Sequence, residues 1–219
     1  KIIARIGDDE DGQYIRDDLN REGVDTSKLL VEANSKSHVS VILVDENTGD
    51  RSIITRWSTG APIAPHDMTQ DDIRSAKVLF VDDVTDATMQ AAQWAKDAGV
   101  HVVIDPAQMF AGSQPILPYV DVPIVPEHFA NDWMPDEPPE NVVEALYDMG
   151  ASIAIVTLGE HGCVVCSDEG VQRFPTFPVE VVDTTGAGDA FHGAFMVALL
   201  HEEWDIAQKV QFASAVGAM

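Results

Sequence analysis

Short apolar segments alternate with helical patterns along most of this chain. From residue 69 onward, helical patterns at 69–76 and 86–98 alternate with runs of aliphatic residues at 78–81 and 101–104. Strands that are apolar along their whole length lie in parallel sheets covered on both faces. The regular alternation of strand and helix is typical of α/β folds. We therefore predict an α/β fold in three layers, with a mostly parallel sheet.

The charge balance excludes two classes of partner. Acidic residues outnumber basic residues by 37 to 13 among 219 residues, which gives a formal net charge of −24. A field of that sign repels nucleic acids and anionic membranes, so we expect neither as a partner. No apolar run approaches the roughly 20 residues that a membrane-spanning helix needs, and no signal peptide opens the sequence. A solvated acidic surface is the simplest explanation of the charge.

The two cysteines, Cys163 and Cys166, lie three residues apart in a predicted strand. Successive side chains of a strand point to opposite faces, so an odd spacing separates these two thiols. We therefore expect neither a disulfide nor a metal site between them. Free thiols fit a reducing cytoplasm.

A glycine turn that leads from β-forming residues into an apolar helix lies at 181–195. Gly186 and Gly188 lack a Cβ atom, so the backbone there can adopt positive φ and approach a ligand closely. The unpaired N–H groups at the start of the helix favour an anion such as phosphate. Asp189 lies in the first turn, where the helix dipole keeps a carboxylate ionised. An anion site beside a base suggests phosphoryl transfer to an alcohol.

Two common nucleotide-binding motifs are disfavoured. A glycine-x-glycine turn before a helix is weak evidence by itself, since many such turns only connect a strand to a helix. The dinucleotide fingerprint requires a third glycine where this chain has Phe191. A P-loop requires Gly-Lys followed by Ser or Thr, a run that the sequence lacks.

The run D-T-T-G-A-G-D-A-F at 183–191 resembles the C-terminal signature of the ribokinase-like sugar kinases, the phosphofructokinase-B family. The resemblance implies a ribokinase-like fold, Rossmann-like with a small β-lid, and ATP-dependent transfer of the γ-phosphate to a hydroxyl group of a small carbohydrate. It also implies that Asp189 is the catalytic base. The anion hole would then be formed by Gly186, Ala187 and Gly188.

The same resemblance implies metal sites. Asp183 and the Thr185 carbonyl resemble the family's monovalent-cation site, which predicts K⁺ as a cofactor. Most family members also carry an Asn-x-x-Glu motif linked to Mg²⁺ and phosphate, but the corresponding positions here are Glu127 and Ala130. This departure puts the Mg²⁺ ligands in doubt, and Glu127 is the candidate replacement.

Two further segments point to ATP. The run T-L-G-E-H-G at 157–162 resembles the family's T-L-G-x-x-G turn, where the triphosphate lies, so Thr157, Gly159 and Gly162 are candidate ATP-binding residues. A tight turn supported by glycine between two strands explains the same pattern. Arg51 lies in a segment similar to a ketohexokinase G-x-R-T-I stretch, where the arginine reaches the phosphates. An edge-strand arginine is also often only a solvated charge.

The resemblance extends over nearly the whole chain. It implies a kinase core at 1–36 and 58–219, incomplete at both termini, and a β-lid hairpin at 37–57. An exposed edge of the lid makes a homodimer possible. The predicted substrate is a small sugar, either a ketose or ribose. A nucleoside kinase of the same fold and a non-catalytic sugar or nucleotide sensor are the alternatives, and a nicotinamide oxidoreductase ranks below both.

Three more polar residues are candidate site residues because of their positions in the sequence. Asp82 and Asp105 follow apolar strands, and ligands of open α/β sheets bind at the carboxyl ends of strands. Each is also explained as a loop or capping carboxylate. His192 lies one turn after Asp189 on the same helix face. We interpret it as a core histidine or one that supports the base, with a proton relay as the alternative.

Overall fold

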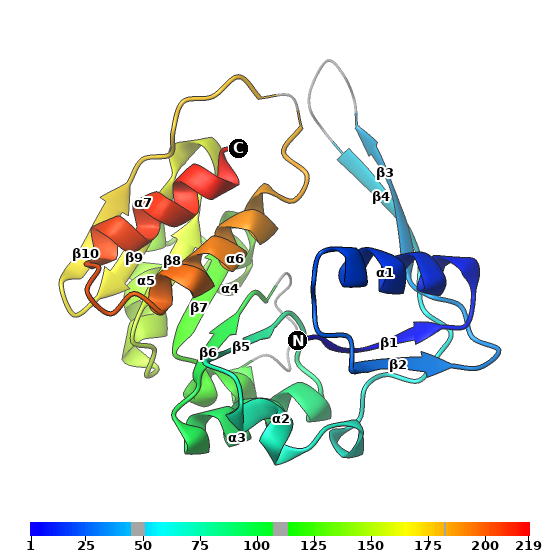
Figure 1. Cartoon of the computed structure of the whole chain (residues 1–219). Coiled ribbons are helices and arrows are strands. Elements are labelled where there is room, and N and C mark those ends of the chain that lie inside the picture. Colours follow the sequence, from blue (N-terminus) through cyan, green and yellow to red (C-terminus); the bar gives the residue numbers. More distant parts are fainter. Residues whose placement is uncertain (45–50, 107–113, 182) are drawn as a thin grey trace. The chain divides into compact units, whose positions relative to one another are not determined.

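A computed structural model describes residues 1–44, 51–106, 114–181 and 183–219, without the side chains of Arg51 and Gln114. The chain divides into two compact units, Lys1–Met68 and Thr69–Met219. Figure 1 shows the elements of both units in sequence colours. Because the two units are not placed relative to each other, each is described separately.

The first unit contains a βαβ unit and a hairpin. Its elements are β1 (Ile3–Gly7), α1 (Glu10–Arg21), β2 (Lys28–Glu32), β3 (Val39–Val44), β4 (Arg51–Arg56) and the 3₁₀ turn η1 (Pro65–Asp67). Strands β1 and β2 pair in parallel, whereas β3 and β4 pair antiparallel. The Asp9 carboxylate accepts the N–H of Gly12 and so caps α1. Hydrogen bonds from Ser37 and Gly12 lower the pKa of Asp9 to about 2.

The hairpin exposes apolar side chains on both of its faces. Leu43 and Val44 in β3, and Ile53 and Ile54 in β4, are each more than half exposed. Neighbouring residues of a strand point to opposite faces, so exposure of consecutive residues in each strand means that neither face of this ribbon is covered within its unit. The hairpin is the most apolar exposed element of the first unit.

The second unit is built on a six-stranded sheet with the order β10-β9-β8-β7-β6-β5. The strands are β5 (Val78–Val81), β6 (His101–Ile104), β7 (Val122–Pro126), β8 (Ala154–Thr157), β9 (Cys163–Ser167) and β10 (Gly170–Phe174). Strands β5 to β8 run parallel, and β9 and β10 add antiparallel pairs at one edge. The predicted α/β fold with a mostly parallel sheet is confirmed.

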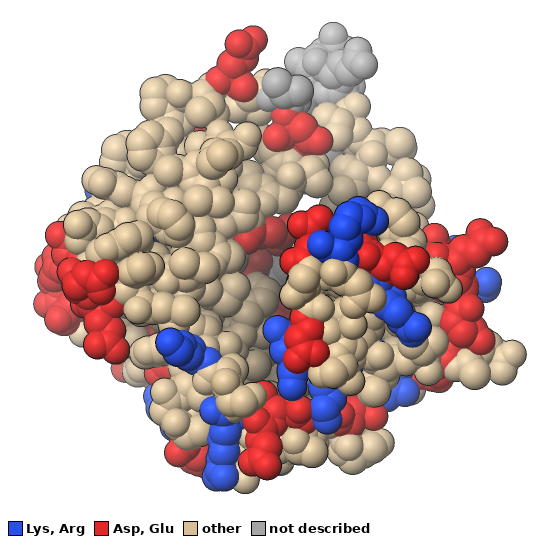
Figure 2. All heavy atoms as spheres, viewed as in Figure 1, with Lys and Arg blue, Asp and Glu red and all other residues tan. Residues whose placement is uncertain are grey.

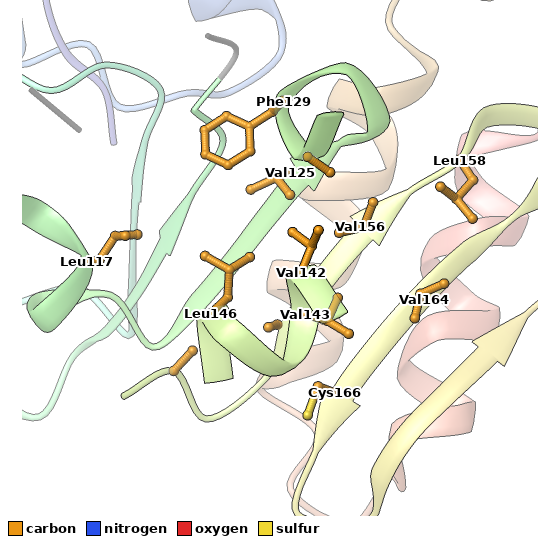
Figure 3. Packing of buried hydrophobic residues seen from close by; sticks show 13 residues of the cluster. Leu117, Val125, Phe129, Val142, Val143, Leu146, Val156, Leu158, Val164 and Cys166 are labelled. Carbon is orange, nitrogen blue, oxygen red and sulfur yellow. The ribbon is translucent and has the colours of Figure 1, made fainter. Parts of the chain in front are cut away.

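Helices cover this sheet on both faces. The helices and 3₁₀ turns are α2 (Gln70–Arg74), α3 (Asp86–Ala98), η2 (Gln114–Tyr119), α4 (Glu127–Trp133), α5 (Pro139–Asp148), η3 (Gly159–His161), α6 (Ala187–Leu199) and α7 (Ile206–Gly217). Val142 and Leu146 of α5 pack with Val125, Val156 and Val164 of the sheet, as Figure 3 shows. A second core cluster joins the other face of the sheet to α6 and α7. Buried strand residues thus point alternately to the two faces of the sheet, into one cluster or the other. The sheet is the middle layer, and the helices on its two faces form the outer layers.

The cysteines illustrate this alternation. Cys163 packs in the cluster with α6 and α7, and Cys166 packs in the cluster with α5. Both thiols are free and buried, and burial raises the pKa of Cys163 to about 12. The prediction that the two side chains lie on opposite faces without a disulfide is confirmed.

Two surface properties accompany this fold. Acidic side chains lie in several separate groups over the face shown in Figure 2, not in one patch. Within the described parts of the chain, none of the helices combines the length and the apolar character needed to cross a membrane.

Candidate active site

The turn before α6 is organised by its own backbone. Gly186 is the N-cap of α6 and has φ of +82° and ψ of −1°, the left-handed conformation that glycine adopts without strain. The Gly186 carbonyl accepts the N–H of Ala190 at 2.8 Å, and the N–H of Ala187 donates to the Thr184 carbonyl at 3.2 Å. The Asp183 carboxylate accepts the N–H of Thr185 at 2.8 Å. These bonds close a tight turn that leads directly into the helix.

The first turn of α6 has the properties of an anion site. By helix geometry, the N–H groups of residues 187–189 have no intrahelical acceptor, and they lie at the positive end of the helix dipole. A Cβ atom at Gly188 would meet no described atom within 4 Å, so the space beside this residue is open. Asp189 is exposed in the same turn. Of the predicted anion-hole residues, Ala187 already uses its N–H within the turn, whereas the side of the turn at Gly188 is open.

Contacts of His192 place this turn at the carboxyl edge of the sheet. The Nε2 atom of His192 lies 3.3 Å from the carbonyl oxygen of Ile124 in β7. The same atom lies 3.6 Å from Oδ2 of Asp105, directly after β6. Open α/β sheets bind ligands beyond the carboxyl ends of their strands. The first turn of α6 therefore lies where this class of fold binds its substrates.

Carboxylates concentrate negative charge at this edge. Burial raises the pKa of Asp105 above its usual value; His192 acts in the opposite direction, and the charges of Asp189 and Asp82 raise the pKa further. An added cation would relieve this repulsion. No group of three or more metal-binding side chains is preassembled within the described ranges.

The turn after β8 is shaped by packing. Thr157 ends β8, and its hydroxyl group lies 3.5 Å from the carbonyl oxygen of Val125, to which it donates. The N–H of Leu158 donates to the Gly162 carbonyl at 2.8 Å. Gly162 has φ of +82°, and a Cβ atom there would overlap the carbonyl oxygen of Phe174. The glycine at this position is therefore required by the close approach of the chain after β10.

Two more predicted site residues follow from strand register. Pro126 of β7 pairs with Thr157 of β8, so Glu127, the exposed first residue of α4, follows at the same edge of the sheet. The side chain of Arg51 lies outside the described residues. The structure thus brings Glu127, Thr157 and the α6 turn to one edge of the second unit.

The pair formed by Asp105 and His192 is a feature that sequence patterns did not predict. Asp105 was expected as a loop or capping carboxylate, and His192 as a core or supporting histidine. Their proximity depends on how α6 crosses the sheet, which no local pattern encodes. The available signal was an apolar strand that ends in an aspartate, since such residues lie at the ligand-binding edge.

Comparison with known proteins agrees with this geometry. The family described as pfkB family carbohydrate kinase matches residues 1–219. Probable fructokinase-5 of Arabidopsis thaliana is 27% identical over 250 residues, which span 100% of this chain and 75% of that protein. The ATP-dependent ribose-1-phosphate kinase of Halopiger xanaduensis is 29% identical over 222 residues, which span 100% of this chain and 73% of that protein.

A solved structure extends the agreement to three dimensions. The crystal structure of a ribokinase from Thermotoga maritima matches with a TM-score of 0.86 and 25% identity. The match covers 99% of this chain and 72% of the ribokinase chain. Because the family match extends over all of its residues and the fold agrees, this chain belongs to the pfkB family of carbohydrate kinases.

Proposed function

We propose that this carbohydrate kinase transfers the γ-phosphate of ATP to a hydroxyl group of a small sugar, with Asp189 as the general base. The observation that carries the proposal is the exposed Asp189 carboxylate in the first turn of α6. The open space beside Gly188 lies in the same turn. A base and an anion site within one helical turn are two of the groups that phosphoryl transfer to an alcohol uses.

In the proposed mechanism, Asp189 accepts the proton of the sugar hydroxyl as its oxygen attacks phosphorus. In the turn formed by Gly186, Ala187 and Gly188, backbone N–H groups that are not used within the turn stabilise charge on the transferred phosphoryl group; that of Ala187 donates to the Thr184 carbonyl. A general base contributes about 10² to 10⁴ in rate. Fixed donors aimed at developing charge contribute about 10² to 10³ for each donor. Positioning and electrostatic stabilisation thus account for the larger share of the rate.

The remaining predicted ligands complete the proposal. Thr157, Gly159 and Gly162 border the ATP triphosphate, and Arg51 binds a phosphate. Glu127 would hold Mg²⁺, whose charge would offset that of the phosphates. The strand register that places Glu127 and Thr157 at one sheet edge supports this assignment.

A monovalent cation is the second proposed metal. Asp183 and the Thr185 carbonyl would hold K⁺ beneath the anion hole. The turn in which Asp183 accepts the Thr185 N–H places both residues directly before α6. We expect faster turnover in K⁺ than in Na⁺ or choline buffers at equal ionic strength. Equal rates in all three would contradict the cation site.

For the substrate, we propose a ketose or a pentose such as ribose. The relatives' names, fructokinase, ribose-1-phosphate kinase and ribokinase, support this range. A nucleoside kinase is the near alternative within the same fold. A non-catalytic sugar or nucleotide sensor is the alternative favoured by the altered Asn-x-x-Glu region, where Ala130 replaces the acid. Measuring ADP release over a panel of sugars and nucleosides separates the three.

The central test is the variant Asp189→Asn. We expect turnover to fall by about 10² to 10⁴, the contribution of a general base, while affinity for ATP stays within about twofold because the anion site keeps its N–H groups. Asp97→Asn, an exposed change in α3, is the matched control and should leave turnover unchanged. Wild-type turnover in Asp189→Asn would overturn the assignment of the base.

We further propose that the hairpin at 37–57 is a lid distinct from the core at 1–36 and 58–219, and that it joins two copies of the chain. The exposed apolar faces of β3 and β4 support an interface with a second copy. Light scattering should give a dimer mass for the wild type and a monomer mass for Ile54→Glu. Tyr14→Glu, at an exposed position on α1, should remain a dimer. A monomeric wild type at micromolar concentration would contradict the proposal.

We also propose that the protein works in the reducing cytoplasm. The support is chemical: both cysteines are free and buried, and burial raises both thiol pKa values. Fluorescent tagging of the full-length protein in its own cells would test this, and export from the cytoplasm would contradict it.

A further inference from the structure

Both ring nitrogens of His192 face carbonyl oxygens. The Nδ1 atom lies 2.6 Å from the Gly188 carbonyl oxygen, and Nε2 lies 3.3 Å from the Ile124 carbonyl oxygen. A neutral imidazole has one N–H and one lone pair, so it can donate to only one of these oxygens. The doubly protonated ring donates to both. The two distances therefore favour the imidazolium form.

A counter-charge lies beside the ring. Oδ2 of Asp105 is 3.6 Å from Nε2 of His192, whose side chain is only 7% exposed. A buried charge is costly unless it is paired and hydrogen-bonded, and Asp105 supplies the pairing. The other titratable groups that act on Asp105 are Asp82 after β5, Asp189 in α6 and His128 in α4. Burial and the charges of Asp189 and Asp82 raise the pKa of Asp105, whereas His192 and His128 lower it.

Aromatic packing fixes the ring in place. The ring of Phe191 meets His192 edge-on at a centroid distance of 6.4 Å, and the ring of Phe80 lies 5.9 Å away at a tilt. Such neighbours restrict rotation of the imidazole about its side-chain bonds. The ring of His192 therefore contacts one aromatic residue of its own helix and one of β5.

We propose that His192 is a positioning residue for phosphoryl transfer: as an imidazolium paired with Asp105, it links the Gly188 carbonyl, and with it the first turn of α6, to the Ile124 carbonyl in β7. The tie fixes the direction of the N–H groups and the position of the Asp189 carboxylate in that turn. Donors held in place before the reaction stabilise its charge without reorganisation. This proposal rests on the proposed kinase function, because it assigns that turn to the reaction.

The state of the ring can be measured without any catalysis. The ¹⁵N resonances of His192, assigned with the variant His192→Gln, should show two protonated ring nitrogens near neutral pH. The variant Asp105→Asn removes the counter-charge, so the ring should lose one proton under the same conditions. A neutral tautomer in the wild-type protein would overturn the proposal. So would an unchanged spectrum in Asp105→Asn.

Kinetics test the positioning role. His192→Leu removes both donors at similar side-chain volume, and we expect kcat to fall by about 10-fold to 100-fold, the effect of a small misplacement of reacting groups. KM for ATP should stay within about twofold, because the N–H groups of the turn remain. His192→Gln and His192→Asn each restore one donor and should recover part of kcat.

The matched control is Phe195→Leu. Phe195 lies on the same helix and is fully buried in the apolar cluster, so its truncation lowers stability without removing a polar contact. Equal kcat in His192→Leu and Phe195→Leu would overturn the positioning role. If the wild-type chain phosphorylated no sugar or nucleoside, the proposed function would fail, while the ring resonances would still decide whether His192 ties the turn.

Discussion

Two glycine turns in the second unit share a backbone angle but differ in what surrounds them. Gly162, after β8, and Gly186, before α6, both have φ of +82°. A Cβ atom at Gly162 would overlap the carbonyl oxygen of Phe174, whereas a Cβ atom at Gly186 would have Asp189 Oδ2, 3.9 Å away, as its only described neighbour within 4 Å. One glycine is required by packing and the other by conformation alone.

This difference separates a structural role from a functional one. The turn at Gly162 is closed by backbone of its own sheet, so packing explains this glycine whether or not the turn also borders ATP. The turn at Gly186 and Gly188 faces open space at the carboxyl edge of the sheet, beside an exposed carboxylate, Asp189. Open space by itself marks no site, since Gly170 borders it too; at Gly188 it coincides with a helix N-terminus and an exposed carboxylate.

The largest effect on stability is expected from Gly162→Ala. The added methyl group must displace backbone, and overpacking of this kind costs about 1–3 kcal/mol, while positive φ in a residue with a Cβ atom adds about 1–2 kcal/mol. Thermal unfolding should show Tm lower by about 10 °C, since about 1 kcal/mol shifts Tm by 2–4 °C at this chain length.

The control for this change is a glycine with positive φ and free surroundings. Gly170→Ala, at the first residue of β10, introduces the strain without the overlap, because a Cβ atom there meets no described atom within 4 Å. Gly170→Ala should therefore lower the free energy of unfolding only by the cost of positive φ, about 1–2 kcal/mol. If both alanine variants lost the same stability, the overlap with Phe174 would not contribute to the loss. Packing would then not distinguish the turn at Gly162 from the turn at Gly186.

A change at Gly188 is expected to lower activity without lowering stability. Gly188 lies within α6, where alanine is the better helix former by about 1 kcal/mol, and its Cβ atom would enter open space. Gly188→Ala should therefore unfold at the same or a slightly higher temperature. If the open space holds the transferred phosphoryl group, kcat should fall by about 100-fold, because the methyl group displaces the reacting atoms.

Steady-state kinetics and calorimetry on the same preparation check this prediction. Gly193→Ala, in the same helix, is the matched control, because its Cβ atom also meets open space but lies beyond the first turn. It should gain stability and keep kcat. Full activity in Gly188→Ala would show that the open side of the turn is not the phosphate site.

The sequence predicted most of the second unit because its strands carry continuous apolar runs. The predicted segments 78–81, 86–98 and 101–104 coincide with β5, α3 and β6. Strand β2 (Lys28–Glu32) was not predicted, because two charged residues at its ends leave an apolar core too short to show a period. The local sequence pattern therefore predicts strands that are buried along their length, but it does not predict strands that are short and partly exposed.

For the site, the motifs predicted which residues matter more reliably than they predicted what each residue contacts. The glycine turn and Asp189 were identified from spacing and family resemblance. The overlap that fixes Gly162 depends on Phe174, across the β9–β10 hairpin, and the Asp105–His192 pair depends on the path of α6 over the sheet. Contacts between distant segments follow from tertiary packing, which single-sequence periods do not encode.

The smallest expected effect is that of Gly186→Ala, and it tests whether conformation alone explains this glycine. Because its Cβ atom would make no close contact, the cost should be only that of the left-handed conformation, about 1–2 kcal/mol. Gly186→Asn should cost less, since asparagine adopts this conformation more readily than alanine. Calorimetry of both variants checks the order. A greater loss in the asparagine variant would mean that side-chain size, not backbone angle, limits this position, and Gly186 would then resemble Gly162.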